Sequence, residues 1–587
     1  MKKQIYLHEF NMPMEGSIYL PLASGLIRAY AESILEIKAA YEFAPFIFRR
    51  EPIEQLMEVY DNPAFALFSV AAWNEQYCLE VSKNIGQRWP DCGIVFGGSQ
   101  IPSGKNKARD YMMAHPWISY AVLGEGEGDI AEILLHHLNP LKEEIGITRK
   151  TIALGSIPSP YLAGLYDYLL EEDSGIKYQA IFETNRGCPY HCAFCGWDRG
   201  GQQEGIRSFD ISRIKAEIDW MGYHGIDYIF CADGNFGILD RDIEIARMIC
   251  DTKERYGYPE KVRACYAKDA GDRVVKIASI LKACDAGKAV THARQSYSAK
   301  VLRLVGRKGQ KDKQIQQFRE DLNAVNIPTY SELILGLPGE TFLSWIDGLE
   351  RAMSERSQLF IYPAQVYPNA QLSDPAYQAL HGIVTRRILL TETHGLPRQE
   401  REPEEYEEII VSTKTLSEDD FRLSLVISWM VMTLHGMGLC RELLNWMADQ
   451  GEERTNFLGN LFKIAPYISG LNLLFIKNLC AFLSNNADRI LSGGGRCLTL
   501  PAYGEFYWDV EEAAFLFIQE HREDFYRDIR AVAEWYMLGL ELDTNSLAEI
   551  IYRDREHIPS LADYQHDRLR YARDVVLHGR KSGRFDD

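Results

Sequence analysis

Three cysteines, Cys188, Cys192 and Cys195, lie within eight consecutive residues of the sequence. The spacing Cys-x3-Cys-x2-Cys is too short for paired strands and predicts a tight loop that can point three sulfurs at one centre. Thiolates are the ligands of iron–sulfur clusters, and three thiolates on a four-iron cluster leave one iron without a protein ligand. An open coordination position is typical of a catalytic metal site. The spacing therefore predicts a reactive [4Fe-4S] cluster.

Two other uses of these cysteines remain open. A structural zinc ion takes four ligands, usually as two separated pairs, and no second pair follows in the sequence. His191 lies between the cysteines, where so short a loop can hardly turn it onto the same ion. The chain has 12 cysteines. Without a secretory context we expect them to be reduced, which disfavours disulfides.

With Phe194 directly before its last cysteine, the motif resembles the signature of radical S-adenosylmethionine (radical SAM) enzymes. The resemblance implies that the open iron holds the amino and carboxylate groups of S-adenosylmethionine (SAM). An electron from the cluster then cleaves SAM to a 5'-deoxyadenosyl radical. Cys188, Cys192 and Cys195 would be the metal ligands and the catalytic centre, and Phe194 would contact the cofactor.

The composition bounds the kinds of protein that can hold such a loop. A chain of 587 residues is long enough for two to four domains, and 46% apolar and 25% charged residues are ordinary for a globular protein. The net charge of -19 disfavours a nucleic-acid partner, because phosphate contacts need a basic surface. The most apolar run, 423–439, is shorter than the about 20 residues of a membrane span, and no export signal is visible. We expect a cytoplasmic protein without a membrane partner.

Residues 1–145 alternate short apolar runs with helical patterns. Strands are predicted at 4–8, 44–48, 65–70, 93–97 and 119–123, and helices at 22–35, 52–60, 74–88 and 129–137. Repeated βα units of this length indicate a doubly wound, Rossmann-like parallel sheet. In such a sheet ligands bind beyond the carboxyl ends of the strands.

Three of these strand ends carry loops that are rich in glycine or polar residues. Taken singly, each loop is an ordinary turn in which glycine supplies a positive φ. Taken together and placed before a radical SAM signature, they resemble the cobalamin-binding domain of the B12-dependent radical SAM group. The residues that the resemblance implies as cobalamin contacts are Ser69, Trp73, Asn74, Gly97, Gly98, Ser99, Gly124, Glu125 and Glu127. The sequence has no Asp-x-His-x-x-Gly motif, so a histidine of that motif cannot ligate the cobalt.

Residues 146–178 predict a linker, and from 179 to 370 the βα alternation resumes. Strands are predicted at 179–183, 227–232, 261–267, 289–294, 329–336 and 360–366, with helices between them. Six strands are fewer than the eight of a closed barrel, and the count resembles the partial (β/α)6 barrel of radical SAM enzymes. The cysteine loop then follows the first strand, at the rim where barrel chemistry takes place.

The ends of the later strands are predicted to contact SAM. The residues implied by the resemblance are Asp233, Asn235, Gln295, Ser296, Gly336, Tyr362 and Gln365, and the last strand continues to Asn369 in a segment that resembles those that embrace adenine. A carboxylate at Asp233 suits the ammonium group of methionine. A structural interpretation also exists, because Asp233-Gly234 is a turn dipeptide and Gly336 permits a turn.

Residues 371–587 have a different character. An acidic run at 398–408 predicts a solvated connector. Beyond it apolar residues recur at helical spacing over 420–450, 471–484, 510–520, 525–540 and 546–552. This pattern predicts a mostly α-helical carboxyl-terminal domain, which we associate with the substrate.

The whole chain thus resembles a cobalamin-dependent radical SAM methyltransferase. The resemblance implies methylation of an unactivated carbon of a peptide or small-molecule natural product, with methylcobalamin as methyl donor and a flavodoxin-type reductase as electron donor. Two alternatives remain open. One keeps the same cofactors for cyclisation, ring rearrangement or polar methylation of an aromatic carbon, and the other is a non-catalytic sensor that binds cobalamin or the cluster.

Overall fold

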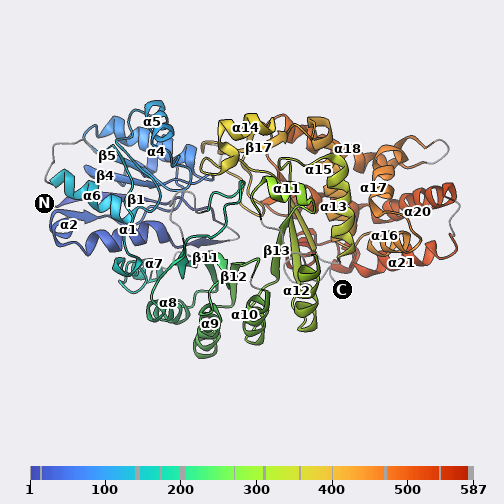
Figure 1. The fold of residues 1–587 in the computed structure, drawn as a ribbon, viewed down its shortest axis with the longest axis horizontal. Coiled ribbons are helices and arrows are strands. Elements are labelled where there is room, and N and C mark those ends of the chain that lie inside the picture. The colour runs from blue at the N-terminus through green and yellow to red at the C-terminus, as the bar shows by residue number, and fades with distance from the viewer. Residues whose placement is uncertain are drawn as a thin grey trace. The chain divides into compact units, whose positions relative to one another are not determined.

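The structure is a computed structural model, drawn in Figure 1, that describes residues 2–13, 16–138, 146–171, 175–197, 205–269, 271–307, 312–355, 358–398, 401–468, 472–540 and 544–579. The chain divides into two compact units. Unit 1 consists of Met1–Lys288, Val366–Asp374 and Arg398–Glu407. Unit 2 consists of Ala289–Gln365, Pro375–Pro397 and Glu408–Asp587.

The amino-terminal part of unit 1 is built on a parallel sheet with the strand order β3-β1-β4-β5-β6-β7. Its strands are β1 (Lys3–His8), β3 (Tyr41–Phe43), β4 (Pro63–Ser69), β5 (Gly93–Gly97), β6 (Tyr120–Val122) and β7 (Ile147–Thr148). Successive side chains of a strand point to opposite faces. Helices α1 (Leu22–Glu32) and α6 (Glu127–Leu138) therefore pack on Ile5 and Leu7, whereas α4 (Glu75–Arg88) and α5 (Lys105–Ala114) pack on the face of Tyr6. The predicted Rossmann-like fold is confirmed.

Two features of this sheet differ from the sequence prediction. The strand predicted at 44–48 is wrong, because pairing occurs over Tyr41–Phe43 and residues 44–48 contribute only a bridge from Ile47 to His8. The short strand β2 (Ser17–Tyr19) was not predicted, and it joins the next sheet along the chain beside β8 (Lys177–Phe182). Three residues are too few to show a period in the sequence, so only the pairing partner reveals this strand.

All six strands predicted for the partial barrel are present, in two parallel sheets. Unit 1 holds the order β12-β11-β8-β2, with β11 (Tyr228–Phe236) and β12 (Lys261–Tyr266). Unit 2 holds β13 (Val290–Gln295), β14 (Thr329–Leu335) and β15 (Gln358–Pro363) in that order. The compact units therefore divide the predicted 179–370 domain between residues 288 and 289 and again between residues 365 and 366. The division follows spatial packing, which a reading along the chain does not show.

Three helices cover one face of the β12-β11-β8-β2 sheet, as Figure 1 shows for the green segment. They are α8 (Ile211–Tyr223), α9 (Asp242–Tyr256) and α10 (Gly271–Ala283). Ile214, Ile245 and Ile277 are fully buried in the same core as Ile229 of β11. Side chains that alternate with these core residues, such as Phe230 of β11, point to the opposite face, which we call the inner face.

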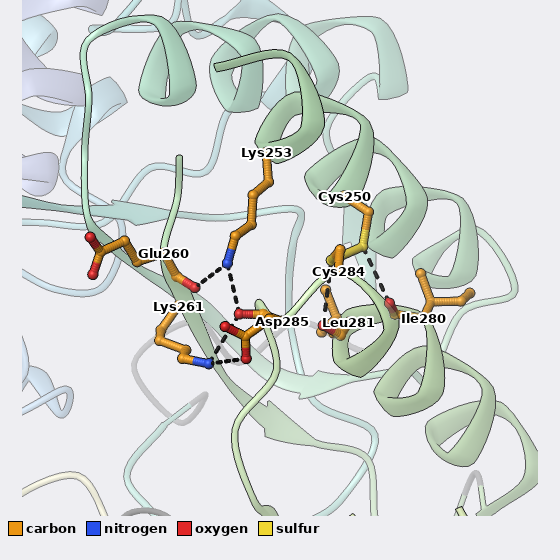
Figure 2. The surroundings of a disulfide bond; sticks show 8 residues. All are labelled: Cys250, Lys253, Glu260, Lys261, Ile280, Leu281, Cys284 and Asp285. Atoms are coloured by element: carbon orange, nitrogen blue, oxygen red, sulfur yellow. Dashed lines mark hydrogen bonds and ion pairs between the residues drawn. A yellow bond between two sulfur atoms is a disulfide. The ribbon is translucent and has the colours of Figure 1, made fainter. Parts of the chain in front are cut away.

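A disulfide joins Cys250 of α9 to Cys284, which directly follows α10 (Figure 2). The two Cα atoms are 5.6 Å apart, because α9 and α10 pack side by side. The prediction that all 12 cysteines are reduced is therefore wrong for Cys250 and Cys284. The prediction rested on the expected cellular compartment, which does not tell which helices pack together. The two cysteines are 34 residues apart in the sequence, so no local pattern pairs them. Lys253 and Lys261 fix the adjacent turn by donating hydrogen bonds to Asp285.

The carboxyl-terminal part of unit 2 is helical, as predicted, but its first helix is interrupted. The predicted helix 420–450 consists of α15 (Glu418–Met430), a π-helical turn η3 (Val431–Gly436) and α16 (Arg441–Asp449). Further helices are α17 (Arg454–Lys463), α18 (Leu474–Leu491), α19 (Val510–Glu520), α20 (Arg522–Gly539) and α21 (Leu547–His557). Within the described ranges no single helix is long and apolar enough to cross a membrane. Glu418–Gly436 and Arg441–Asp449 together have the necessary length and apolar composition, but they are bent by 97° relative to each other.

Among the described residues of the acidic run at 398–408, Glu405 and Glu407 are buried, which differs from the solvated connector that the composition predicted. The Glu405 side chain is fully buried in unit 1, where its carboxylate accepts hydrogen bonds from the backbone N–H groups of Gln76 and Tyr77. These groups belong to the first turn of α4, which a carboxylate stabilises because the helix dipole is positive there. Arg50 also faces Glu405, at 3.6 Å. A tertiary partner thus overrides the tendency of a charge run to face water.

Candidate active site

The cysteine loop begins at the carboxyl end of β8, as predicted. Before it, β9 (Asn185–Arg186) pairs antiparallel with β10 (Arg207–Ser208). Gly187 follows with a φ of +109°, and a Cβ atom there would lie 2.4 Å from the carbonyl oxygen of Gly205. Only glycine permits both this φ and this close approach. The loop is therefore anchored directly before Cys188.

The three cysteines differ in burial and in their hydrogen bonds. Cys192 is buried, Cys188 and Cys195 are partly exposed, and all three are outside the disulfide. The N–H of Cys195 donates to the carbonyl of Cys192 at 3.1 Å, which closes a tight turn. Asn235 Nδ2 donates to Cys188 Sγ at 3.1 Å, and the N–H of Trp197 donates to Cys195 Sγ at 3.4 Å. Hydrogen bonds to sulfur stabilise cluster thiolates and tune their iron.

The thiols fit a cluster better than a single ion. Among the described residues, no three His, Cys, Asp or Glu side chains converge on one point where a metal ion could bind. Each cysteine of a cubane cluster binds a different iron, so cluster ligands need not converge on one point. The arrangement of Cys188, Cys192 and Cys195 on one short loop, with N–H groups near two sulfurs, therefore fits a cluster.

Asp233 lies beneath the cysteine loop and is fully buried. One carboxylate oxygen accepts from the N–H groups of Thr184 and Asn185, at 2.7 and 3.1 Å, and the other from the Thr184 hydroxyl and from Asn185 Nδ2. Burial raises the pKa of Asp233 to about 6, although these hydrogen bonds oppose the shift. The carboxylate ties the end of β11 to the start of the cysteine loop, and its contact with SAM remains a prediction.

The loops after β4 and β5 present both exposed and fully engaged residues. Asn74 is buried and engaged, since its side chain accepts from the N–H of Ala71 and donates to the carbonyls of Phe10 and Ser69. Trp73 beside it is 42% exposed. Asn74 therefore shapes the loop that presents the Trp73 ring.

Gly98 is required where the two loops touch. Its φ is +104°, and a Cβ atom would lie 2.5 Å from the carbonyl oxygen of Val70. Gly98 and Ser99 are exposed, Gly97 is partly exposed, and Gly124 after β6 is exposed with a φ of +100°. Exposed backbone at these sheet ends is what a bulky, planar cofactor could approach. The contacts of these residues with cobalamin remain predictions.

Glu125 and Glu127, in contrast, are occupied by arginines of the cysteine loop region. Glu127 is buried and holds Arg186, while Glu125 holds both Arg186 and Arg207. The sequence prediction treated both glutamates as cobalamin contacts. Their ion pairs connect the segment after β6 with β9 and β10, and their contacts with cobalamin remain predictions.

Asn369 is a site residue whose partners the sequence did not reveal. Its side chain accepts from the N–H of Ser103 at 2.7 Å and donates to the carbonyls of Ser99 and Ile101, each at 3.0 Å. Three residues further on, the N–H of Leu372 donates to the carbonyl of Ala193 inside the cysteine loop. The segment Val366–Asp374 thus contacts both the loop after β5 and the cysteine loop. Its partners lie hundreds of residues away in the chain, so no local signal could identify them.

The remaining predicted SAM contacts belong to unit 2. Gln295 ends β13 with a φ of +68°, which is strained for a residue other than glycine, and strain of this kind is frequent at functional sites. The Ser296 hydroxyl donates to the buried Glu340 at 2.8 Å. Gly336 has a φ of +95° beside the carbonyl of Ile410. Tyr362 is exposed and Gln365 forms a bridge with Ile409. Backbone conformation or buried partners thus fix the positions of Gln295, Ser296, Gly336 and Gln365. The contacts of these residues and of Tyr362 with SAM remain predictions.

A pocket in unit 2 combines the end of β15 with the carboxyl-terminal helices. It is small, with a cavity volume of about 30 Å³, and its lining includes Tyr362, Trp429, Met432, Arg496 and Glu511. Apolar side chains form part of the wall and charged side chains another part. The helical domain and the last strand of the predicted barrel therefore share a cavity.

The inner face of the unit 1 sheet carries a second candidate surface. Arg263 and Cys265 of β12 are exposed, while Val262 and Ala264 between them are buried. Arg263 lies opposite Phe230 in the β11 register and donates a hydrogen bond to Tyr228. The Lys288 ammonium lies 4.2 Å from the centre of the Tyr228 ring. Two cations thus lie on a face that α8, α9 and α10 do not cover.

Comparison with known proteins adds to this geometry. Residues 182–351 match the model of the radical SAM superfamily. The chain is 30% identical over 581 residues, or 93% of its length and 84% of the relative, to the cobalamin-dependent radical SAM methyltransferase TokK of Streptomyces tokunonensis. It is also 30% identical over 424 residues to the 2-(S-pantetheinyl)-carbapenam-3-carboxylate methyltransferase of Streptantibioticus cattleyicolor, covering 69% of this chain and 61% of that relative.

Solved structures show the same fold. The radical SAM methyltransferase TsrM of Kitasatospora setae, with tryptophan and a SAM analogue bound, has a TM-score of 0.52 at 14% identity over 72% of this chain and 88% of TsrM. TsrM with cobalamin and a [4Fe-4S] cluster has a TM-score of 0.50 at 15% identity, covering 66% of this chain and 77% of TsrM. At such identities the likeness concerns the fold.

Proposed function

Because the chain belongs to the cobalamin-dependent radical SAM methyltransferases, we propose that it methylates an unactivated carbon of a small-molecule natural product that carries a carboxylate. Its cofactors are a [4Fe-4S] cluster, SAM and cobalamin. When bound, these groups supply a radical that removes a substrate hydrogen and a methyl group that replaces it. The observation that supports this function most is the glycine-anchored cysteine loop of Cys188, Cys192 and Cys195 at the end of β8.

The protein contributes positioning and charge, because the cofactors carry the chemistry. Asn235 donates to Cys188 Sγ and stabilises its thiolate form, and Asp233 holds the start of the loop. Exposed backbone at Gly98, Ser99 and Gly124 and the exposed Trp73 ring offer a surface for cobalamin. These roles follow from the contacts of each side chain and extend the family assignment to individual residues.

The carboxylate in the proposed substrate follows from the inner face of the sheet. An arginine has five N–H donors in a planar fork that matches a carboxylate, so Arg263 can hold Tyr228 and still bind an anion. Lys288 adds a second positive charge beside the same tyrosine. The carbapenam methyltransferase relative acts, by its name, on a carboxylate.

The electron for the cluster is proposed to come from a flavodoxin-type reductase. Such a donor and an oxygen-sensitive cluster both operate in a reducing compartment, which supports the cytoplasm as the place of action. Neither a nucleic acid nor a membrane is part of the proposal, because a net charge of -19 disfavours polyanionic partners.

The function is tested by anaerobic reconstitution with iron, sulfide and cobalamin, followed by reaction with SAM, a reductant and 2-(S-pantetheinyl)-carbapenam-3-carboxylate as probe. We expect a product heavier by one methyl group, together with 5'-deoxyadenosine and S-adenosylhomocysteine. S-adenosylhomocysteine and a methylated product without deoxyadenosine would instead establish polar methylation. Cleavage of SAM with methylation of peptides but of no carboxylate-bearing small molecule would refute the substrate class.

The anion site has its own test in the variant Arg263→Met. Loss of a charge-assisted hydrogen bond of about 1.5–3 kcal/mol corresponds to a rise in KM of about tenfold to a hundredfold. The control Arg255→Met removes an exposed arginine of α9 that pairs with Asp219 on the helical side. Equal KM values for the two variants would rule out Arg263 as the carboxylate partner.

A further inference from the structure

Two arginines stand side by side directly before the cysteine loop. Arg186 of β9 and Arg207 of β10 are paired residues of the same antiparallel ladder. Arg186 is two positions before Cys188 in the sequence. Its guanidinium lies 5.7 Å from the centre of the Phe209 ring, which covers it on one side. The two side chains therefore present a pair of rigid, positively charged forks at the base of the loop.

Three carboxylates surround these arginines: Glu125 from the loop after β6, Glu127 from the first turn of α6, and Glu183 from the segment after β8. Arg186 Nη2 is 2.8 Å from Glu127 Oε1 and 2.9 Å from Glu183 Oε2. Arg186 Nη1 is 3.3 Å from Glu127 Oε2 and 3.4 Å from Glu125 Oε2, and Arg207 contacts the other oxygen of Glu125. We call these five residues the arginine clamp.

The clamp is largely removed from water. The side chains of Arg186, Glu127 and Glu125 are 13%, 4% and 16% exposed. Buried ion pairs are seldom the most stabilising way to join two surfaces, because both charges lose their hydration, but their fixed geometry can specify one arrangement. A bidentate contact such as that of Arg186 with Glu127 fixes orientation as well as distance. The clamp is thus suited to hold a geometry.

The two segments that the clamp joins are those on which the proposed cofactor sites depend. One segment carries Cys188, and its start is fixed independently by the hydrogen bonds of Asp233 to Thr184 and Asn185. The other segment contains Gly124, at the carboxyl end of β6. In the sequence motif Gly124-Glu125-Gly126-Glu127, both glutamates therefore bind arginines of the cysteine loop region.

We propose that Arg186 is a positioning residue that fixes the cobalamin-side loop after β6 relative to the cysteine loop, so that each radical formed at the cluster leads to one methyl transfer. This inference rests on the proposed function. Reaction between two bound partners depends steeply on their separation, and a misplacement of about 1 Å can lower a rate on the order of 100-fold. A loosened clamp therefore permits SAM cleavage while methyl transfer fails.

The variant Arg186→Lys tests the proposal, because lysine keeps the positive charge but cannot bind two carboxylates through a fork. The matched control is Arg213→Lys. Arg213 also packs on Phe209, at 4.3 Å, but it lies on α8 and its ion pair, at 2.9 Å from Nε, is with Glu217 of the same helix. Its side chain is 16% exposed, close to the value for Arg186. The two variants thus disturb similar arginines that differ in what they join.

The first readout is the ratio of 5'-deoxyadenosine to methylated product. We expect this ratio to rise about tenfold or more in Arg186→Lys and to stay within about twofold of the wild-type value in Arg213→Lys. A clamp that only stabilised the fold would lower both products together and leave their ratio unchanged. An unchanged ratio in Arg186→Lys would therefore overturn the proposal.

The second readout needs neither substrate nor methyl transfer. Pulsed dipolar spectroscopy of the holoenzyme measures the distance between the reduced cluster and cob(II)alamin. We expect a broadened distance distribution in Arg186→Lys and the wild-type distribution in Arg213→Lys. If the wild-type enzyme yields no methylated product, the proposed function fails, and the width of this distribution still decides the role of the clamp. Identical distributions in all three proteins would refute it.

A second variant covers the case in which Arg186→Lys does not fold. Glu125→Gln keeps the shape of the side chain and removes one charge that faces both Arg186 and Arg207. We expect a rise of about threefold in the product ratio, because Glu127 still holds Arg186. A Glu125→Gln enzyme with full cofactor content and the wild-type ratio would count against the clamp.

Discussion

Replacement of Gly187 by alanine offers a strong test of how the cysteine loop is positioned. Gly187 lies between the clamp residue Arg186 and the cluster ligand Cys188, with a φ of +109°. An alanine there meets two penalties. The backbone conformation is one that side chains with a Cβ rarely adopt, at a cost of roughly 1–3 kcal/mol. The Cβ would also lie 2.4 Å from the Gly205 carbonyl oxygen, which is a rigid backbone atom.

The size of the second penalty follows from the geometry. Cβ atoms essentially never approach a heavy atom closer than 3.0 Å, so the backbone must move by at least 3.0 − 2.4 = 0.6 Å. That movement occurs next to Cys188 and at the end of the β9 and β10 pairing, where Arg186 faces Arg207. The displacement is therefore passed directly to one cluster ligand. We expect Gly187→Ala to lose most of its ability to bind the cluster.

The control is Gly257→Ala. Gly257 ends α9 with a φ of +82°, but no atom lies within 4 Å of the position of its Cβ. This variant carries the backbone penalty without the collision. Both proteins are reconstituted anaerobically, and their iron content, cluster absorbance and thermal unfolding are measured. Full cluster loading of Gly187→Ala, with an unfolding temperature equal to that of Gly257→Ala, would refute the conclusion that the contact with Gly205 positions the loop.

Three further outcomes are expected. Cys192→Ala should abolish cluster binding and deoxyadenosine formation while cobalamin absorbance is retained. The control Cys265→Ala, outside the loop, should keep its cluster. Deoxyadenosine produced by Cys192→Ala would contradict the assignment of Cys192 as a cluster ligand. Burial raises the pKa of Asp554 from 3.8 to about 7 although it accepts hydrogen bonds from α16, so the folded state holds this proton more tightly than the unfolded state. Its contribution to stability is complete below about pH 4 and is lost as pH rises through 7, a loss of about 4 kcal/mol relative to Asp554→Asn. Urea unfolding of both proteins between pH 4 and 8 measures this difference, and parallel profiles would exclude it. Cys250→Ser should lower the free energy of unfolding by about 4 kcal/mol, because the disulfide to Cys284 closes a loop over a separation of 34 residues. Reductant should have the same effect on the wild type and none on the variant in thermal unfolding, and an equal shift in both would disprove the pairing.

Features that depend on neighbours along the chain could be predicted from the sequence. The spacing of Cys188, Cys192 and Cys195 indicated the cluster motif, and the family comparisons agree with it. Alternating apolar runs and helical periods predicted the α/β architecture, and the bounds of β5 at Gly93–Gly97 and of α19 at Val510–Glu520 agree with the prediction. These signals are local, because strand and helix periods repeat within a few residues.

Features that depend on partners far away in the chain were decided by the tertiary structure alone. Glu127 binds Arg186, 59 residues further on, a partner that the sequence did not reveal. Glu405 looked solvated in its acidic run and is buried at the start of α4. Asn369 holds the loop after β5 across 266 residues. The residues next to a carboxylate or amide in the sequence do not tell whether the side chain faces water, a ligand or a buried arginine. Its partner is set only when folding brings distant segments together and removes water from between them.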